Sequence, residues 1–220
     1  MQYEHKYLDG SSCPYPAGKV VCVGRNYFEH IKELNNAVPD EPILFMKPST
    51  SLRTLEDGIE LPDYSQNCHN ETELAILFGK EVRKADASAV EDAIDSYAIA
   101  LDLTLRDIQQ KLKDNGYPWE AAKAFDGACP ISPFIKKEGI ADPQDTMLKL
   151  TVNGEVRQQE STKLMITKIL DLIVYASQRF TFLPGDIFLT GTPAGVAQLV
   201  SGDQLELELE DKYTFKTFVK

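Results

Sequence analysis

Short apolar runs, each closed by a turn residue, constrain the fold of this chain more than any other feature. They are rich in β-branched or aliphatic residues, and each ends at a glycine or a proline. Runs of this length are typical of buried strands, whereas a helix needs a longer periodic pattern. Clear examples are Lys19–Val23, Ile43–Lys47, Glu71–Phe78 and Ile187–Thr190.

Two further pairs of runs predict β-hairpins in the second half of the chain. Asn153-Gly154 lies inside the strand-like segment Met147–Gln158, and this dipeptide is the strongest short-range hairpin signal. The alternating runs Gln204–Leu209 and Tyr213–Val219 flank Asp211-Lys212. We therefore expect antiparallel sheet near the C-terminus.

Helical patterns are fewer than strand patterns. The sequence predicts helices over Tyr27–Leu34, with Asn26 as its cap, and over Ser88–Asp95. Arg106–Asn115 reads as a third helix, and the longest runs from Thr162 to about Arg179. Because strands outnumber helices, the predicted class is α+β or mixed β, and not a doubly wound parallel sheet.

The length of 220 residues suits one domain over residues 1–220, with about 1–17 as a short N-terminal extension. The formal net charge of −11 disfavours binding to nucleic acid or to anionic lipid. No apolar run approaches the ~18 residues that cross a bilayer, and the N-terminus lacks a signal or transit pattern. The four cysteines form no C-x-x-C pair, so we expect reduced thiols and a cytoplasmic protein.

Glu71-Thr72-Glu73 is the first candidate for chemistry. Residues i and i+2 of a strand face the same side, so the two carboxylates would share one face. Like charges this close repel unless one is protonated or a cation lies between them. The alternative is an exposed sheet edge with two solvated glutamates.

Asp102 is the second candidate, because it lies inside the apolar stretch Ile99–Leu103. An ionised aspartate buried there is costly unless it is paired or metal-bound, and the alternative is a turn or capping aspartate. With Glu71 and Glu73 it makes an all-oxygen ligand set, which suits Mg²⁺, Mn²⁺ or Ca²⁺ and not zinc. Lys123 could relieve the remaining negative charge, although in isolation it reads as a surface lysine.

His30 and Glu33 form a third candidate, at helical spacing i and i+3. A carboxylate beside an imidazole orients the ring and raises its basicity, which suits activation of water. The alternative is a surface histidine with an incidental neighbour. A glycine-rich loop at Thr190–Gly195 offers backbone N–H groups that could hold a carboxylate, and it matches no P-loop or dinucleotide pattern.

Taken in order, these segments resemble the fumarylacetoacetate hydrolase superfamily, and within it the single-domain acylpyruvate hydrolases. The resemblance extends from about residue 18 to residue 203. The segments that carry it are Val23–Tyr27 with His30 and Glu33, Pro42–Pro48, Glu71–Ala75, Leu101–Gln109, Pro118–Asp126, Val152–Glu155 and Leu183–Val196.

The resemblance implies a β-roll of mixed sheets with short peripheral helices, and a homodimer. It implies Mg²⁺ or Mn²⁺ on Glu71, Glu73 and Asp102, and an enolate stabilised by Lys123. His30 and Glu33 resemble a dyad that activates water on a lid helix. The remaining positions correspond to substrate contacts, namely Arg25, Arg106, Gln109 and Thr192.

One such site can support several reactions of a small 2-oxo acid substrate. Water directed at an acylpyruvate, such as fumarylpyruvate or acetylpyruvate, would make a hydrolase. Loss of CO₂ from oxaloacetate would make a decarboxylase, and proton transfer on the enolate a tautomerase. A close alternative is a 2-hydroxyhepta-2,4-diene-1,7-dioate isomerase or 5-oxopent-3-ene-1,2,5-tricarboxylate decarboxylase, which needs no water-activating dyad. A metal-dependent binding protein without turnover is the alternative from another class.

Overall fold

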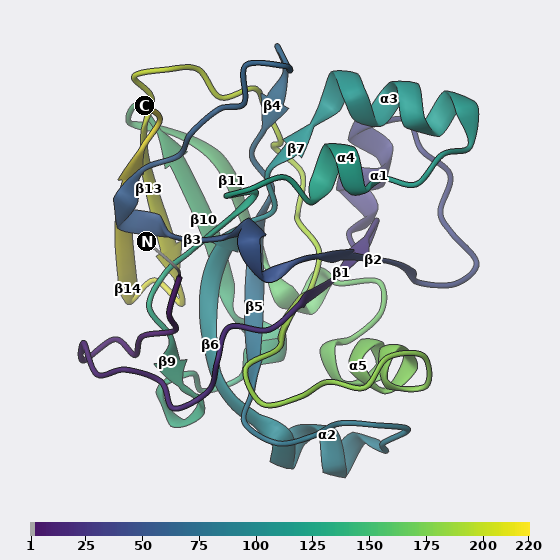
Figure 1. Cartoon of the computed structure of the whole chain (residues 1–220), viewed down its shortest axis with the longest axis vertical. Helices are drawn as coiled ribbons and strands as arrows, with labels where there is room; N and C mark the ends of the chain where they lie inside the picture. Colours follow the sequence, from purple (N-terminus) through teal and green to yellow (C-terminus); the bar gives the residue numbers. More distant parts are fainter. Residues whose placement is uncertain (1–2) are drawn as a thin grey trace.

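An eight-stranded mixed sheet forms the centre of the computed structural model, which describes residues 3–220 (Figure 1). The strand order is β2-β1-β12-β5-β6-β8-β3, and β9 pairs with β6. The pairs β1–β12 and β3–β8 are parallel, and the other pairs are antiparallel. Its strands are β1 (Val20–Gly24), β2 (Ile43–Lys47), β3 (Leu52–Thr54), β5 (Thr72–Phe78), β6 (Ile94–Leu101), β8 (Cys129–Ile131), β9 (Ile135–Lys136) and β12 (Ile187–Leu189).

Both predicted hairpins are confirmed, and together they form a second, four-stranded sheet in the order β11-β10-β13-β14. Asn153 and Gly154 both have positive φ, 51° and 84°, as the tight turn between β10 and β11 requires. A small third sheet pairs β4 with β7. The strands of these two sheets are β10 (Met147–Val152), β11 (Glu155–Ser161), β13 (Gln204–Leu209), β14 (Tyr213–Phe218), β4 (Cys68–His69) and β7 (Thr104–Leu105).

The helices are short and lie around the sheets, so the predicted mixed α+β class is confirmed (Figure 1). Helices α2 and α5 pack against each other, and α3 packs against α4. No helix within residues 3–220 is long and apolar enough to span a membrane. The helices are α1 (Phe28–Glu33), α2 (Ala87–Ala93), α3 (Arg106–Asn115), α4 (Glu120–Lys123) and α5 (Ile169–Ser177).

Strand β5 is buried on both faces and separates two apolar cores. Leu74, Ile76 and Phe78 point into the core shared with the four-stranded sheet, α2 and α5. Ala75 and Leu77 point to the opposite core, beneath β1 and β6. Because side chains alternate along a strand, the positions before Ala75 on this second face are 73 and 71. Glu71 and Glu73 therefore lie on the same face of the strand as Ala75 and Leu77, at its N-terminal end.

The predicted long helix over Thr162–Arg179 is wrong. A short 3₁₀ turn covers Thr162–Leu164, and α5 begins only at Ile169. Between them, Met165 pairs with Tyr27 in an isolated β-bridge, and Ile166 and Thr167 form a bend. The apolar spacing that predicts a continuous helix is real only within α5, and backbone pairing with a distant segment interrupts it.

The side chain of Asn26 holds the segment before α5 in place. Its predicted role as a helix cap is wrong. Helix α1 begins after Tyr27, without a side-chain cap. The Asn26 amide instead donates to the carbonyls of Thr167 and Thr190, at 3.1 and 3.0 Å. Its oxygen accepts from the Thr167 N–H at 2.9 Å. One buried amide thus joins three segments that are far apart in the sequence.

The predicted N-terminal extension is anchored to the rest of the domain by a few buried side chains, and Met1 and Gln2 lie outside the described residues. His5 is buried, and its Nε2 hydrogen-bonds the Gly185 carbonyl at 2.9 Å. Tyr7 forms a bridge to Phe134 and joins the core beneath β1. This segment is part of the domain and not a separate tail.

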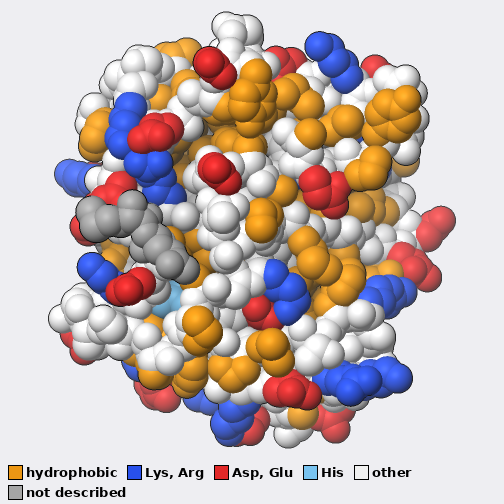
Figure 2. All heavy atoms as spheres, in the orientation of Figure 1, with side chains coloured by type: hydrophobic (Ala, Val, Ile, Leu, Met, Phe, Trp, Pro, Cys, Tyr) orange, Lys and Arg blue, Asp and Glu red, His pale blue; other side chains and the backbone are white. Residues whose placement is uncertain are grey.

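Acidic and basic side chains are interspersed among hydrophobic groups over the face drawn in Figure 2.

We predict that Asn26→Ala lowers the free energy of unfolding by about 2–4 kcal/mol, because buried backbone groups lose their partners. Urea denaturation measures the change. Asn115→Ala is the matched control, since the Asn115 amide is exposed at the end of α3 and bonds only the Lys111 carbonyl. Equal stability of the two variants would contradict the assigned role.

Candidate active site

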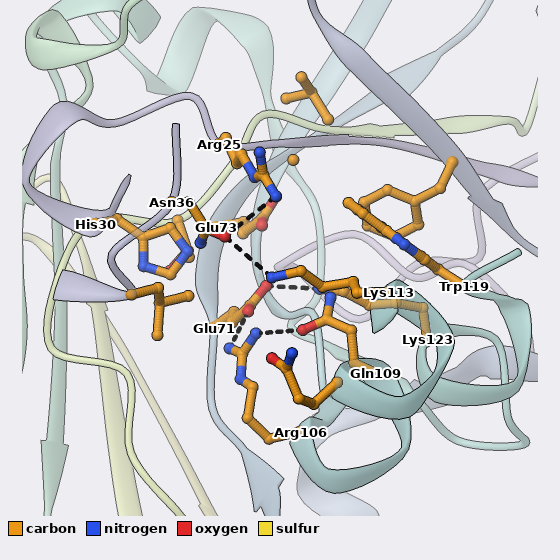
Figure 3. A pocket seen from close by; sticks show the side chains of 16 residues that line it. Arg25, His30, Asn36, Glu71, Glu73, Arg106, Gln109, Lys113, Trp119 and Lys123 are labelled. Atoms are coloured by element: carbon orange, nitrogen blue, oxygen red, sulfur yellow. Dashed lines mark hydrogen bonds and ion pairs between the residues drawn. The ribbon is translucent and has the colours of Figure 1, made fainter. Parts of the chain in front are cut away.

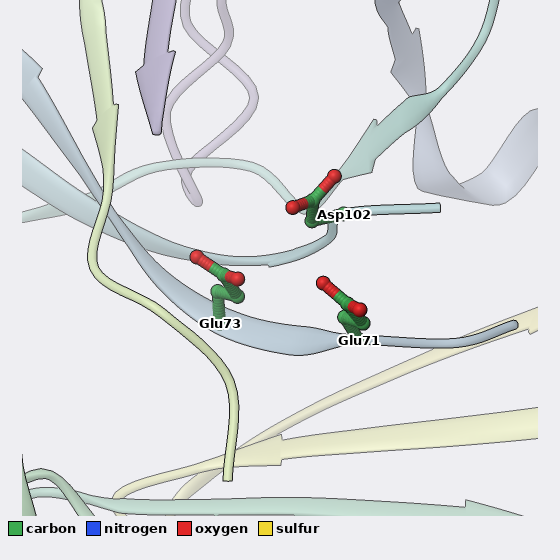
Figure 4. A group of neighbouring side chains, drawn as sticks. All are labelled: Glu71, Glu73 and Asp102. Carbon is green, nitrogen blue, oxygen red and sulfur yellow. The ribbon is translucent and has the colours of Figure 1, made fainter. Parts of the chain in front are cut away.

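Three carboxylates meet where β5 and β6 lie side by side, and we call Glu71, Glu73 and Asp102 the acidic triad (Figure 4). Glu71 precedes β5, Glu73 lies within it, and Asp102 follows β6. The Asp102 N–H donates to the Glu71 carbonyl at 2.8 Å, which sets the two backbones side by side. One oxygen of each carboxylate lies within 4.8 Å of the others, and no member is more than 4% exposed. They do not lie on a solvated edge.

Lys123, on α4, inserts its ammonium group among these carboxylates. Its Nζ donates to Glu71 Oε2 and to Asp102 Oδ2, both at 2.7 Å. The residue is 3% exposed, and the ring of Phe45 lies 4.9 Å from Nζ. Lys123 is therefore not the surface lysine that the sequence alone favours.

Lys47 is a second buried lysine, and sequence reasoning missed it. It ends β2, has no exposed surface, and places Nζ 2.7 Å from Asp102 Oδ1. Its N–H groups are directed at the backbone carbonyls of Leu103, Lys123 and Ala128. Lys47 thus neutralises charge beside Asp102 and fixes the segments that carry Asp102 and Lys123. A lysine closing an apolar strand was the only signal in the sequence.

Arg106 supplies the third cation, from the first position of α3. It pairs with Glu71, and it donates to Gln109 Oε1 at 2.8 Å one helical turn further on. Its Nε also contacts His69 Nδ1 at 3.4 Å. The structure therefore brings together two of the residues that the family resemblance places near the substrate.

These contacts divide the triad electrostatically. Burial raises the pKa of Glu71, but Lys123 and Arg106 outweigh it and hold that pKa well below its usual range. Burial, with the charges of Asp102 and Glu71, raises the pKa of Glu73 well above its usual value. Burial lowers the pKa of Lys123, but the neighbouring carboxylates reverse this and leave it raised. Glu73 is the carboxylate that most needs a further cation.

The glycine-rich loop holds a carboxylate as predicted, although the carboxylate belongs to the protein. The Gly191 N–H donates to Glu73 Oε2 at 2.7 Å. Gly191 has φ 94°, and a Cβ there would lie 2.8 Å from the Cβ of Asn26, so glycine is required. The Thr192 hydroxyl donates to the Thr72 carbonyl at 3.0 Å and accepts from Gln158 at 2.8 Å.

His30 and Glu33 form the predicted pair on α1, with Nδ1 and Oε2 3.4 Å apart. Glu33 also accepts from the Gly195 N–H at 3.0 Å. Burial raises the pKa of Glu33, but the contacts with His30 and the Gly195 N–H outweigh burial and leave this pKa below its usual value. The carboxylate is therefore ionised. An ionised carboxylate can only accept, so the Nδ1 that faces it is the ring nitrogen that donates. His30 is 5% exposed and not a surface histidine.

A cavity of about 170 Å³ connects these groups (Figure 3). In this view Glu71 and Glu73 lie between His30 on one side and Trp119 on the other. Asp102 lies behind Lys123, and Glu33 stands behind His30 as its partner. The predicted residues that line the cavity are Arg25, His30, Glu71, Glu73, Arg106, Gln109, Lys123 and Thr192; Asn36 and Lys113 line it without having been predicted.

The acidic triad fits a hard divalent cation. Its donor set is all oxygen, which suits Mg²⁺ and Mn²⁺. Asp102 Oδ1 is buried and receives no hydrogen bond, despite the nearby Lys47 charge. A buried carboxylate oxygen without a donor is costly, and a bound cation would satisfy it.

We predict that Glu73→Gln weakens Mn²⁺ binding by about two orders of magnitude, because it removes a charged ligand. Titration calorimetry on the metal-free protein measures the affinity. Glu91→Gln, on the exposed side of α2, is the matched control and should bind as the parent does. Unchanged Mn²⁺ affinity in Glu73→Gln would remove this residue from the site.

We predict that Lys47→Met lowers the free energy of unfolding of the metal-free protein by about 3–5 kcal/mol, because the buried Asp102 loses one of its two cations and keeps only Lys123. Mn²⁺ should then stabilise this variant more than the parent, since the ion would balance the same carboxylate. Urea midpoints with and without Mn²⁺ test both statements, with the exposed Lys137→Met as control. Equal metal-induced shifts in parent and variant would contradict them.

Comparisons with known proteins identify the family of this chain. The chain matches the family model "Fumarylacetoacetate (FAA) hydrolase C-terminal" over residues 19–220. It is 51% identical to the oxaloacetate tautomerase YcgM of Escherichia coli (strain K12), covering 94% of this chain and 95% of that protein.

Two solved structures share the fold. A fumarylacetoacetate hydrolase family protein from Yersinia pestis CO92 has a TM-score of 0.97 and 46% identity, covering 99% of this chain and 100% of that one. A fumarylpyruvate hydrolase from Pseudomonas aeruginosa, solved with Mn²⁺ and pyruvate, has a TM-score of 0.91 and 31% identity, covering 99% and 95%. This chain, with its buried acidic triad, therefore belongs to the fumarylacetoacetate hydrolase family.

Proposed function

We propose that this enzyme is a metal-dependent keto–enol tautomerase of oxaloacetate, with hydrolysis of acylpyruvates as a second candidate activity. The observation that carries the proposal is the charge balance of the site. The buried Lys47 and Lys123 and the half-buried Arg106 bring three positive charges to the three carboxylates of the acidic triad. A divalent ion would then leave an excess of positive charge, which favours an anionic substrate such as the dicarboxylate oxaloacetate.

The similarity to YcgM supports the same substrate, since that protein is named an oxaloacetate tautomerase. The small cavity also suits a short organic acid better than a long one. Arg25 and Lys113 add further positive charge along its wall, so an anionic substrate is favoured over a neutral one.

A divalent ion held by the acidic triad would supply Lewis-acid polarisation of the substrate ketone. Lys123 stabilises the negative charge that develops on the substrate oxygen as the enolate forms. Arg106 and Gln109 orient the substrate carboxyl group from α3. His30 Nε2 moves the proton at substrate C3, while Glu33 holds the ring and balances the imidazolium. Tautomerisation needs only this proton transfer and its counterpart on the substrate oxygen.

Acylpyruvate hydrolysis is the second candidate because the same dyad can activate water. The similarity to a fumarylpyruvate hydrolase solved with Mn²⁺ and pyruvate supports it. Decarboxylation of oxaloacetate would use the same enolate and needs no water. An isomerase of the heptadiene dioate would use the same proton transfer on a longer substrate, and the small cavity ranks it below both.

A substrate panel tests the proposal. Ketonisation of enol-oxaloacetate is followed by loss of enol absorbance, beside pyruvate release from oxaloacetate, acetylpyruvate and fumarylpyruvate, each with Mg²⁺, Mn²⁺ or EDTA. We expect kcat/KM for ketonisation to be the highest and EDTA to abolish it. Faster fumarylpyruvate hydrolysis would favour the second candidate, and no turnover of any substrate would reduce the protein to a binding module.

We predict that His30→Ala lowers ketonisation and acylpyruvate hydrolysis by roughly 10²- to 10⁴-fold, the usual worth of general acid–base catalysis. Decarboxylation should fall much less, because it needs only an electron sink. Lys123→Ala should depress all three reactions. Glu29→Gln, exposed on the same helix as His30, is the control. Equal losses in His30→Ala and Lys123→Ala on every substrate would contradict this division of roles.

A further inference from the structure

Two cationic side chains converge on one neutral oxygen at the cavity wall (Figure 3). Lys113 Nζ, from the last turn of α3, donates to Asn36 Oδ1 at 3.0 Å. Arg25 Nη2 donates to the same oxygen at 3.1 Å, and Arg25 Nη1 donates to the Ala37 carbonyl at 3.3 Å. The two cations come from segments far apart in the sequence and share a single amide acceptor.

This pairing is electrostatically incomplete. Among residues 3–220, no carboxylate lies within ion-pair distance, 4.0 Å, of Arg25 or Lys113, so their acceptors are neutral. Burial, with the charges of Arg25 and Arg106, lowers the pKa of Lys113, as expected where cations crowd without an anion. Lys111, two residues earlier on α3, is exposed by contrast.

The backbone also fixes Arg25 in this place. Arg25 has φ 62°, a left-handed conformation that is unfavourable for a residue other than glycine. It follows directly after β1, where the chain leaves the sheet beside the cavity. The turn at Arg25 keeps its side chain at the cavity wall beside Asn36.

We propose that Lys113 and Arg25 form the site for the second carboxylate of a dicarboxylic 2-oxo acid, where that carboxylate replaces the Asn36 amide oxygen. A carboxylate offers two charged oxygens, one for the ammonium and one for the guanidinium, and charge-assisted hydrogen bonds are stronger than those to an amide. The proposal rests on the proposed function and adds a basis for substrate specificity. Lys113 and Arg25 would select dicarboxylates over monocarboxylates of the same length.

Lys113→Gln tests the proposal against a matched pair of substrates, oxaloacetate and its 4-methyl ester, which lacks only the distal charge. We expect kcat/KM for oxaloacetate to fall roughly 10- to 100-fold, mainly through KM, and the value for the ester to change less than about twofold. Lys113→Arg should restore most of the loss. Lys111→Gln, on the same helix, should behave as the parent does.

Asn36→Asp provides an independent variant of nearly identical shape. It places a permanent carboxylate on the two cations, so it should raise KM for oxaloacetate and leave the ester almost unaffected. Two substitutions that change charge in different partners would then give the same substrate-selective effect, which a loss of folding cannot imitate.

Binding separates this proposal from the proposed function. Calorimetry with 3,3-difluorooxaloacetate and its 4-methyl ester, neither of which can enolise, measures affinity in the Mn²⁺-loaded protein without tautomerisation. A parent that binds the diacid more tightly, with the preference lost in Lys113→Gln, supports the site even if enol-oxaloacetate is not turned over. A parent that ketonises oxaloacetate, but whose preference for the diacid is the same in Lys113→Gln, overturns it.

Discussion

The burial of three carboxylates against three cations is the interaction on which the rest of this structure depends. Removing ionised groups from water is costly unless each finds a partner, and an incomplete set would destabilise the centre of the sheet. Lys47, Arg106 and Lys123 come from three separate segments to pair with Glu71 and Asp102, and Glu73 is held by the Gly191 N–H. A divalent ion would add positive charge beside the carboxylates. A dianionic substrate would then offset that charge in a site from which water is excluded.

The fold serves this balance by bringing short segments to one end of a buried strand. Glu71 and Glu73 continue the face of β5 that is otherwise apolar, so the carboxylates are held on a rigid strand and not on a loop. Asn26 ties the start of α1 to the loop after β12, and Gly191 in that loop holds Glu73. The helix that carries His30 is thereby linked to the carboxylate below it.

Much of this arrangement follows from local sequence. Strand periodicity places Glu71 and Glu73 on one face, the apolar setting of Asp102 indicates burial, and Asn153-Gly154 marks its hairpin. The interruption before α5 could not be predicted, because a distant amide, Asn26, overrides a helical pattern. The roles of Lys47 and Lys113 could not be predicted either, because they too depend on segments that are distant in the sequence. A lysine acquires its role from groups brought near it by the fold, and neither spacing nor composition reports those neighbours.

Anomalous diffraction from crystals grown with Mn²⁺ and a non-reactive 2-oxo acid would show whether the acidic triad holds the metal. We expect one strong manganese peak bounded by Glu71, Glu73 and Asp102, with Lys123 Nζ beside the ligand and no longer shared between Glu71 and Asp102. A manganese peak elsewhere on the chain, or an acidic triad that remains closed around Lys123 at saturating Mn²⁺, would contradict it.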